Sequence, residues 1–430
     1  MLRRDLLKKS AGLAGTGLLP ALLPALLPVG RSAWAAVGVE PPALPRRLVV
    51  VFLRGAVDGL SVVVPYAEAG YRRARTSIAL APPGSEGGVI DLDGQFGLHP
   101  ALAPLMPLWR SGTLGFVHAS GSPDDTRSHF DAQDYMETAT PGRKSTPDGW
   151  LNRLLGALPA DAGQRAAATR AVSIGAVLPR IYAGRHPVAS IASGKAATRP
   201  TLLDRPKVGD AFNRLYGGDD AMSRAYQASQ RARREVMDAM DPGDIEREMQ
   251  AANNGASLPA GFPDDAARLA RLMRNDGRVQ LAFMALGGWD THANQGAASG
   301  QLANRLAPLG QGLAALAGGL GPAFDDTVVV VMSEFGRTVA QNGNGGTDHG
   351  HGNVMWLLGG RVAGGKVHGR WPGLEASELY EGRDLAVTTD FRAVLAEVGE
   401  AHLQLPQVRL GDVFPSFTSS AASRLGVLRA

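Results

Sequence analysis

The sequence predicts an α/β fold, a three-layer sandwich built around a mostly parallel central sheet. Two observations predict it. Apolar, β-branched runs recur along the chain without regular alternation of polar and apolar residues, which is typical of strands buried on both faces. Helical patterns separate several of these runs, and a repeated order of strand and helix indicates a parallel sheet covered by helices.

The first 35 residues are expected to be an export signal. Arg3 and Arg4 form a twin-arginine pair, residues 13–29 are uncharged and largely apolar, and Ala33-Trp34-Ala35 fits a cleavage site. A membrane anchor is the alternative, but glycines and prolines interrupt the run, which is marginal for the ~20 residues of a span. We therefore expect export by the twin-arginine translocation machinery, a periplasmic or secreted location, and no stable membrane span after cleavage.

The charge of the remaining chain is balanced. Five of the 44 basic residues and one of the 40 acidic residues lie in the export segment, which leaves 39 of each. A neutral domain gives no electrostatic reason to expect nucleic-acid binding. The chain contains no cysteine, so disulfides, thiolate metal ligands and thiol catalysis are excluded.

Residues 36–430 are expected to form one domain. Six apolar runs are the predicted strands, and they begin at Arg46, Thr113, Ala171, Arg278, Thr327 and Asn353. The predicted helices between and after them cover residues 99–110, 128–138, 150–157, 301–318 and 390–398. Residues 206–274 differ, because long charged helical stretches are broken there by proline and glycine, and we expect an inserted helical subdomain or lid.

Polar clusters follow several predicted strands, where the ligand site of an open parallel sheet forms. Asp58 follows the first strand, Ser128 opens a helix after the second, and Asp290 and His292 follow the fourth. The motif TDHGHGN, which contains Asp348, His349 and His351, comes shortly after the fifth. Since the carboxyl ends of parallel strands meet at one edge of a sheet, we expect these side chains to converge.

Carboxylates and imidazoles without thiolates suit zinc, manganese, magnesium or calcium, and the imidazoles favour a transition metal. The expected metal ligands are Asp58, Asp290, His292, Asp348, His349 and His351. They predict one or two divalent metal ions. Two ions ~3.5–4 Å apart would activate a hydroxyl nucleophile and hold the attacking and leaving oxygens of a phosphoryl or sulfuryl transfer.

Plainer explanations exist for several of these residues. Asp58 before Gly59 is a common turn element, and Asp290 can begin a turn that leaves His292 on the surface. Ser128 with Asp131 matches a helix N-cap, although a hydroxyl at a helix N-terminus also faces a positive pole that suits an anion.

Three further charged residues also have alternative readings. Arg127 either binds an anion at this helix N-terminus through two hydrogen bonds or lies in solvent. Glu334 and Arg337 either act directly in catalysis or form a buried structural ion pair near the site, and the ion pair is expected.

The ordered motifs resemble a known family. The motifs are LRGAVDGL, FGLHPALAPL, SHFDAQDYM, GGWDTHANQ, SEFGRT, DHGHGN and GRDLAVTTDFRAVLAEV, and together they resemble the exported bacterial proteins of domain-of-unknown-function family 1501. The resemblance is collinear and spans nearly the whole mature chain. That family is similar in turn to the alkaline phosphatase and sulfatase superfamily, whose members share a mixed α/β sandwich with a metal site at the strand ends.

The resemblance implies roles for individual residues. Asp58 would be the metal aspartate after the first strand, and Ser128, or Thr126 in its place, the hydroxyl nucleophile. The remaining implied ligands are Asp290, His292, Asp348, His349 and His351. The pair Asp290-x-His292 is spaced more narrowly than the usual internal ligand pair, which suits a site with one metal. The sulfatase motif Cys/Ser-x-Pro-x-Arg is absent, so formylglycine chemistry is not supported.

We therefore expect an exported, metal-dependent hydrolase of phosphate or sulfate esters that acts on a small-molecule or polymer-borne ester. Ser128 would attack, and Arg127 or His129 would stabilise the developing charge. A non-catalytic exported binding or assembly factor on a hydrolase-like scaffold is the alternative. Transferase or mutase chemistry at the same site would differ only in the group acceptor.

Overall fold

The computed structural model describes residues 45–161, 164–165, 167–175, 178–193, 218, 251–420 and 423–429. The chain divides into Met1–Ala43 and Leu44–Ala430, and all described residues belong to the second unit. The predicted export signal and residues 206–250 of the predicted insertion, apart from Gly218, lie outside the described residues. Among the helices that are described, none is long and apolar enough to cross a membrane.

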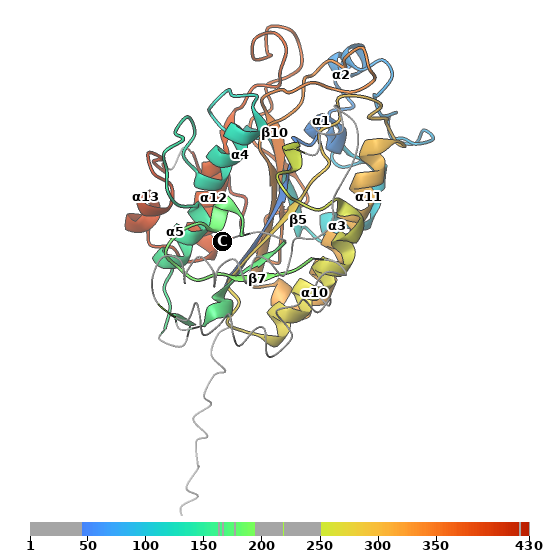
Figure 1. Ribbon diagram of the computed structural model, residues 1–430. Helices are drawn as coiled ribbons and strands as arrows, with labels where there is room; N and C mark the ends of the chain where they lie inside the picture. Colours follow the sequence, from blue (N-terminus) through green and yellow to red (C-terminus); the bar gives the residue numbers. More distant parts are fainter. Residues whose placement is uncertain are drawn as a thin grey trace, which may run out of the picture. The chain divides into compact units, whose positions relative to one another are not determined.

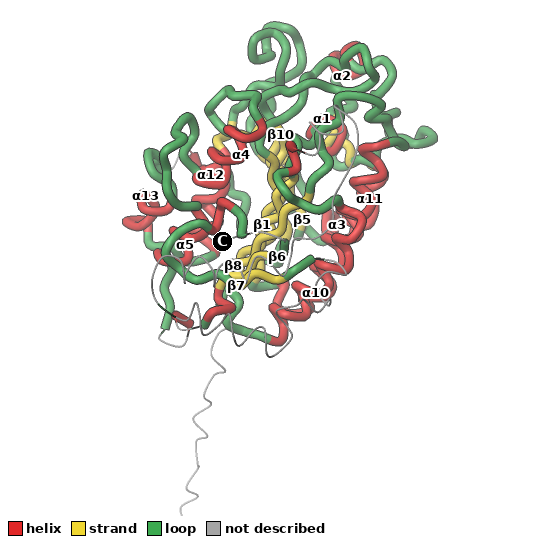
Figure 2. The backbone as a smooth tube through the Cα atoms, in the orientation of Figure 1, coloured by secondary structure: helices red, strands yellow, loops and turns green. Residues whose placement is uncertain are grey.

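A nine-stranded sheet forms the centre of this unit (Figures 1 and 2). Along the sheet the order is β11, β5, β10, β9, β1, β8, β6, β7, and β12 pairs with β5. The strands are β1 Arg47–Leu53, β5 Leu114–Gly121, β6 Ala171–Ile174, β7 Ala189–Ile191, β8 Leu281–Leu286, β9 Thr327–Ser333, β10 Asn353–Leu358, β11 Val367–His368 and β12 Thr389–Asp390. The six strands expected from the apolar runs are confirmed.

The sheet is mostly parallel, as predicted, with one antiparallel strand. β9, β1, β8, β6 and β7 run parallel, whereas β10 is antiparallel to both β9 and β5. This reversal places the start of β10 at the edge where β9 ends. The loop before β10 therefore lies beside the loops that follow β1, β8 and β9.

Helices cover both faces of the sheet (Figure 2). One layer contains α3 Met106–Arg110, α10 Phe262–Asn275 and α11 Gln301–Leu320, and the other contains α4 His129–Thr138, α5 Trp150–Ala157, α12 Phe391–Glu397 and α13 Leu410–Val413. Strand β1 shows why both layers are needed: Val49, Val51 and Leu53 pack in one core, and Leu48, Val50 and Phe52 in the other. The three-layer α/β sandwich is confirmed.

Smaller elements complete the unit. α1 Gly59–Val62 and α2 Ala69–Ala74 follow β1, and a second sheet contains β2 Val63–Val64, β3 Ile90–Asp91 and β4 Gly97–Leu98. Short 3-10 turns cover Pro100–Leu105, Ala168–Arg170, Arg180–Tyr182, Pro259–Gly261, Gly321–Phe324 and Gln407–Arg409, and a π-helical turn covers Val398–His402.

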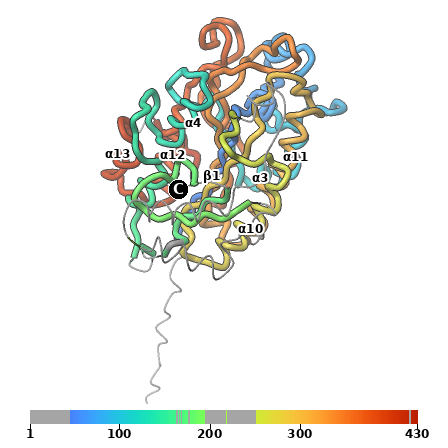
Figure 3. The backbone as a smooth tube through the Cα atoms, in the orientation of Figure 1, coloured from blue at the N-terminus to red at the C-terminus, as the bar shows by residue number. Residues whose placement is uncertain are grey.

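The end of the predicted insertion belongs to a main helical layer. Helix α10 packs along α11 (Figure 3), and its Phe262, Leu269 and Met273 are buried in the same core as β1. Most charged side chains of this amphipathic helix are exposed or partly exposed, whereas Asp265 is buried. Residues 262–274 of the predicted insertion thus contribute to the main core, and the insertion over residues 206–274 stays a prediction.

Candidate metal centre

Three imidazoles and one carboxylate converge at the edge of the sheet where β8 and β9 end. The Nε2 atom of His349 lies 2.9 Å from Nε2 of His129 and 2.9 Å from Nε2 of His292. Asp290 Oδ1 lies 3.0 Å from Nε2 of His292 and 3.4 Å from Nε2 of His349. Asp290 Oδ2 lies 3.6 Å from Nε2 of His129. We call these four residues the histidine–aspartate cluster.

Three separate segments deliver the cluster. His129 is the first residue of α4, Asp290 and His292 follow β8, and His349 lies in the glycine-rich loop before β10. Glycine at position 350 is required by close packing, because a β-carbon there would lie 2.4 Å from the carbonyl carbon of Arg337. The sheet edge and this tight loop therefore bring together residues that are far apart in sequence.

The second nitrogen of each ring fixes its tautomer. His129 Nδ1 lies 2.8 Å from Glu334 Oε1, His292 Nδ1 lies 3.1 Å from Asp348 Oδ1, and His349 Nδ1 lies 2.9 Å from the carbonyl oxygen of Arg127. Carboxylate and carbonyl oxygens only accept hydrogen bonds, so each Nδ1 donates a proton. In the neutral rings, each Nε2 lone pair then faces the others, as in histidines that bind a metal.

The cluster favours a positive charge at its centre. Burial alone would lower the pKa of His129, but the carboxylates of Asp290 and Glu334 outweigh burial and raise it to about 9. Hydrogen bonding to Asp290 raises the pKa of His292, whereas burial lowers that of His349. Three lone pairs and a carboxylate within hydrogen-bonding distance repel one another unless a proton or a metal cation lies among them.

One buried oxygen supports the fit to a metal. Arg337 donates a hydrogen bond to Asp290 Oδ1, but Oδ2 of the same carboxylate is buried without a hydrogen-bond partner among the described residues. A buried carboxylate oxygen without a donor is unfavourable. A cation among the three Nε2 atoms and this carboxylate would remove that cost. His129, Asp290 and His349 each offer one ligand atom, and these atoms lie within 4.8 Å of one another.

The structure places the other predicted site residues differently. Asp348 lies beside the cluster, where it accepts from His292 Nδ1 and from the side-chain amide of Asn342. His351 stacks on the ring of Tyr380, with ring centroids 4.7 Å apart, and its side chain is not among the converging groups. The residue type alone suggested a ligand at position 351, but in the structure His349 and His351 have different neighbours.

Asp58 is the clearest correction. Both of its carboxylate oxygens bind the buried guanidinium of Arg75, at 2.6 and 2.9 Å, and Ser61 and Gln295 donate to the same group. Burial raises the pKa of Asp58, but the charge and hydrogen bonds of Arg75 outweigh burial and lower it. This carboxylate is already neutralised and saturated with donors, so it has no free oxygen for a metal.

Asp58 is nevertheless connected to the loops of the cluster. The side-chain amide of Gln295 donates to Asp58 at 2.7 Å. The Oε1 atom of the same amide accepts from the hydroxyls of Thr291 and Thr347, at 2.8 and 2.9 Å. Thr291 lies between Asp290 and His292, and Thr347 lies two residues before His349. The buried Asp58 thus anchors the loops that carry cluster residues.

The predicted catalytic residues lie at the rim. Ser128 is the exposed N-cap of α4, and its Oγ accepts weakly from the Asp131 amide at 3.4 Å. Arg127 forms ion pairs with Glu381 and Asp384, at 2.5 and 2.9 Å, so its charge is compensated. His129 was expected to stabilise charge beside Ser128, and the structure instead directs its Nε2 into the cluster.

Glu334 and Arg337 do not pair with each other. Glu334 accepts from His129 and from the amide of Gly55, whereas Arg337 binds Asp290 and several backbone carbonyls. Each therefore supports a different member of the cluster. The spacing SEFGR places both at one strand end, but it does not indicate their separate partners.

Arg305 is a further residue that the sequence did not indicate. It lies in the first turns of α11, and its Nη1 is buried without a hydrogen-bond partner among the described residues. Burial lowers its pKa, and the nearby carboxylate of Asp290 counteracts that effect. Arg305 is thus a cation beside the cluster that forms no ion pair within the described part of the chain, and the helical pattern around it carried no signal for that role.

The fold and the cluster define an α/β protein with a candidate metal centre at the carboxyl edge of its sheet. The chain belongs to the family described as "Protein of unknown function (DUF1501)", whose model matches residues 95–414. The expected family is therefore confirmed. No curated protein matches the sequence.

Several solved structures are distantly similar. One is Ps i-CgsB in complex with k-i-k-neocarrahexaose, with 12% identity, 84% of this chain and 72% of that chain covered, and a TM-score of 0.39. Another is the alkaline phosphatase of the Antarctic bacterium TAB5, with 10% identity, 74% and 91% covered, and a TM-score of 0.30. The lipoteichoic acid synthase LtaP of Listeria monocytogenes has 12% identity, 73% and 65% covered, and a TM-score of 0.31. Similarity this low carries no argument about the reaction.

Proposed function

We propose that this protein is an exported, metal-dependent hydrolase of phosphate or sulfate esters. In this proposal His129, Asp290, His292 and His349 hold one divalent cation. The observation that carries it is the convergence of three imidazole Nε2 atoms and an unpartnered carboxylate oxygen. Oxygen atoms of Glu334, Asp348 and Arg127 accept from the Nδ1 atoms and so orient the three rings. Histidines that bind a metal commonly have such a hydrogen-bond partner on their second nitrogen.

The donor set favours a transition metal. Three imidazoles and one carboxylate suit zinc or manganese better than calcium or magnesium, which prefer oxygen ligands. One ion is proposed, because Asp58 is bound to Arg75 and His351 stacks on Tyr380. When bound, such a cation acts as a Lewis acid that polarises an ester oxygen and stabilises the charge that develops on it.

The residues of the chain supply anion binding and a nucleophile. Arg305 lies near Asp290 and has a buried Nη1 without a hydrogen-bond partner among the described residues, so we assign it to the phosphate or sulfate group. Ser128 is the proposed nucleophile, because it is exposed and stands in the sequence between His129 and Arg127, whose carbonyl oxygen accepts from His349 Nδ1. Arg127 is not needed as an anion clamp, since Glu381 and Asp384 already neutralise it.

The test uses the full mature chain. Bound metal is measured by elemental analysis, and hydrolysis is screened with 4-nitrophenyl phosphate, bis(4-nitrophenyl) phosphate and 4-nitrophenyl sulfate. We expect one ion per chain, its loss in His349→Ala, and its retention in the matched control His186→Ala, whose exposed ring lies outside the cluster. A chain that binds no metal, or a His349→Ala variant that keeps it, refutes the metal site. Turnover that survives Ser128→Ala refutes the nucleophile.

The residues at the rim of the site, Arg127 and Ser128, favour a second, non-catalytic function. Arg127 forms ion pairs with Glu381 and Asp384, and Ser128 caps α4, so both side chains already have structural partners. This observation supports a non-catalytic, metal-binding export or assembly factor. Stoichiometric metal without turnover on any of the three esters would favour this alternative.

A further inference from the structure

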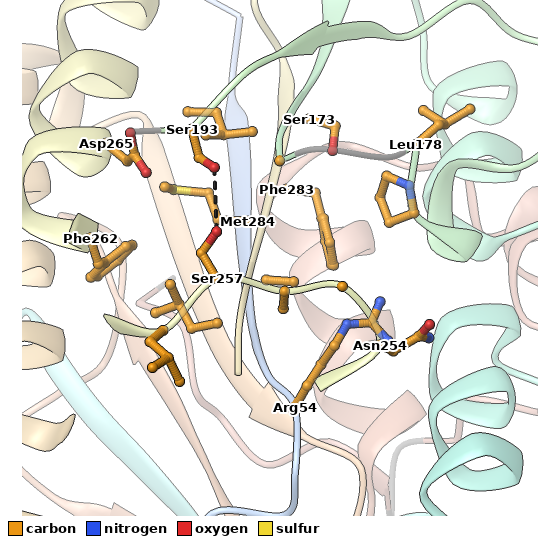
Figure 4. A pocket seen from close by; sticks show the side chains of 18 of the residues that line it. Arg54, Ser173, Leu178, Ser193, Asn254, Ser257, Phe262, Asp265, Phe283 and Met284 are labelled. Atoms are coloured by element: carbon orange, nitrogen blue, oxygen red, sulfur yellow. Dashed lines mark hydrogen bonds between the residues drawn. The ribbon is translucent and has the colours of Figure 1, made fainter. Parts of the chain in front are cut away.

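A cavity of about 710 Å³ opens at the ends of β6 and β8 (Figure 4). We infer that it binds the organic part of the substrate, an aromatic or branched apolar group that carries one hydrogen-bond acceptor. This inference rests on the proposed function and adds the class of ester. The volume falls within the range of about 300–1,000 Å³ that is typical of small-molecule sites.

The walls of the cavity are suited to an apolar group. Phe283, Met284 and Leu286 of β8 form part of its lining and are buried. Leu178 and Leu258 also line it, and they are 44% and 56% exposed. Among the described residues only two other large apolar side chains, Phe130 and Val408, are so exposed. Exposed leucines at the mouth of a cavity indicate a surface that an apolar ligand covers.

Arg54 supplies one polar anchor. Its side chain is 3% exposed, and its terminal nitrogens bind Gln133 and Glu137. Its Nε has no hydrogen-bond partner among the described residues, and the residue lines the cavity. Glu137 already neutralises the guanidinium, so the acceptor that Nε requires does not need to be an anion. A carbonyl, ether or phenolic oxygen on the ligand would satisfy it.

Two connections relate the cavity to the cluster. Gln133 accepts from Arg54 and donates to Glu334, the carboxylate that holds His129. On the other side, Leu258 and Arg305 both pack over Gly288, where an added β-carbon would lie 2.6 Å from Leu258 Cδ2 and 3.2 Å from Arg305 Nε.

Asp290 follows Gly288 by two residues. An ester whose anionic group binds at Arg305 and the cluster would therefore direct its organic group past Leu258 into the cavity. The substrate class is an amphipathic ester of a bulky apolar alcohol or phenol.

The test measures binding of 8-anilinonaphthalene-1-sulfonate, which joins an aromatic body to acceptor oxygens, by its fluorescence on the full mature chain. We expect saturable binding of one probe per chain. Ser257→Trp, which fills the exposed mouth, and Leu258→Asp should each weaken binding at least tenfold. Val408→Asp is the matched control, because Val408 is 88% exposed and does not line the cavity, and its affinity should be unchanged. Unchanged affinity in both cavity variants, or equal loss in the control, overturns the inference.

A second measurement separates this inference from the proposed function. His349→Ala protein, treated with a chelator, should bind the probe with the affinity of the wild-type chain, because the cavity does not include the cluster. Probe binding without metal or ester turnover would leave the cavity assigned and refute the hydrolase. Ester turnover that does not prefer 1-naphthyl phosphate over methyl phosphate, and is unaffected by Leu258→Asp, would refute the cavity and leave the hydrolase.

Discussion

His129 and His349 place their Nε2 atoms 2.9 Å apart, although 220 positions separate the two residues in the sequence. Their Nδ1 atoms are committed to Glu334 and to the carbonyl of Arg127. Neither Nε2 therefore has a proton to donate while both rings are neutral. A proton or a metal cation between the rings would relieve the repulsion between their lone pairs, and in the proposed function a divalent metal takes this place together with Asp290 and His292.

Metal removal should destabilise the fold. A ligand that binds only the folded state adds about 2.7 kcal/mol when its free concentration is 100 times Kd. We expect a chelator to lower the melting temperature of the wild-type chain and to leave that of His349→Ala unchanged, as calorimetry can measure. An equal shift in both proteins would show that the chelator acts elsewhere.

Glu334→Gln should weaken metal binding without removing a ligand. Glu334 is buried and fixes His129 through Nδ1, and loss of such a partner typically costs 10–100-fold in metal affinity. Asp348→Asn is the comparison, because Asp348 holds His292 in the same way but its side chain is 54% exposed. Titration with zinc should give the larger loss for Glu334→Gln. An equal or smaller loss would contradict the role assigned to the buried carboxylate.

The sequence predicted the scaffold better than the site. Buried strands carry their signal locally, in runs such as VVVFL, because both faces of each strand need apolar side chains. Asp58 is bound by Arg75, which is 17 residues away in the sequence, and no pattern in the sequence indicates that these two side chains meet. His129 was predicted to stabilise charge beside Ser128 and not to join the cluster, because that role depends on the orientation of its ring. The local sequence Ser128-His129 is compatible with a helix cap alone and with a metal ligand at His129.

Asp58→Asn should reduce stability rather than abolish the site. The substitution leaves the fully buried Arg75 without its counter-charge, and breaking a buried ion pair in this way costs about 3–5 kcal/mol. We expect a lower free energy of unfolding in urea, while the folded variant still binds one metal ion. Complete loss of metal from protein that is demonstrably folded would show instead that Asp58 is a ligand.

Arg305→Ala should weaken anion binding and leave the metal in place. The guanidinium has a buried nitrogen without a hydrogen-bond partner among the described residues, so its removal should not lower the free energy of unfolding. We expect the affinity for inorganic phosphate, measured by calorimetry on metal-loaded protein, to fall at least tenfold. Arg278→Ala is the control, because Arg278 is an exposed arginine paired with Asp276. Unchanged phosphate affinity in Arg305→Ala would remove this residue from the site.

Acid should destabilise the domain through its buried neutral histidines. Burial lowers the pKa of His402 to about 4, from an ordinary value of 6.5, and its Nε2 donates to the carbonyl of Arg47. The unfolded chain then binds more protons than the folded chain between pH 6.5 and 4. The stabilisation is thus complete above pH 6.5 and is lost as the pH falls through 4, by about 3 kcal/mol for this group. His402→Gln keeps a donor for Arg47 and removes the titration, so its free energy of unfolding should depend less steeply on pH in this window. His186→Gln, at an exposed position, should retain the wild-type slope, and identical slopes for His402→Gln and the wild-type chain would contradict the assignment.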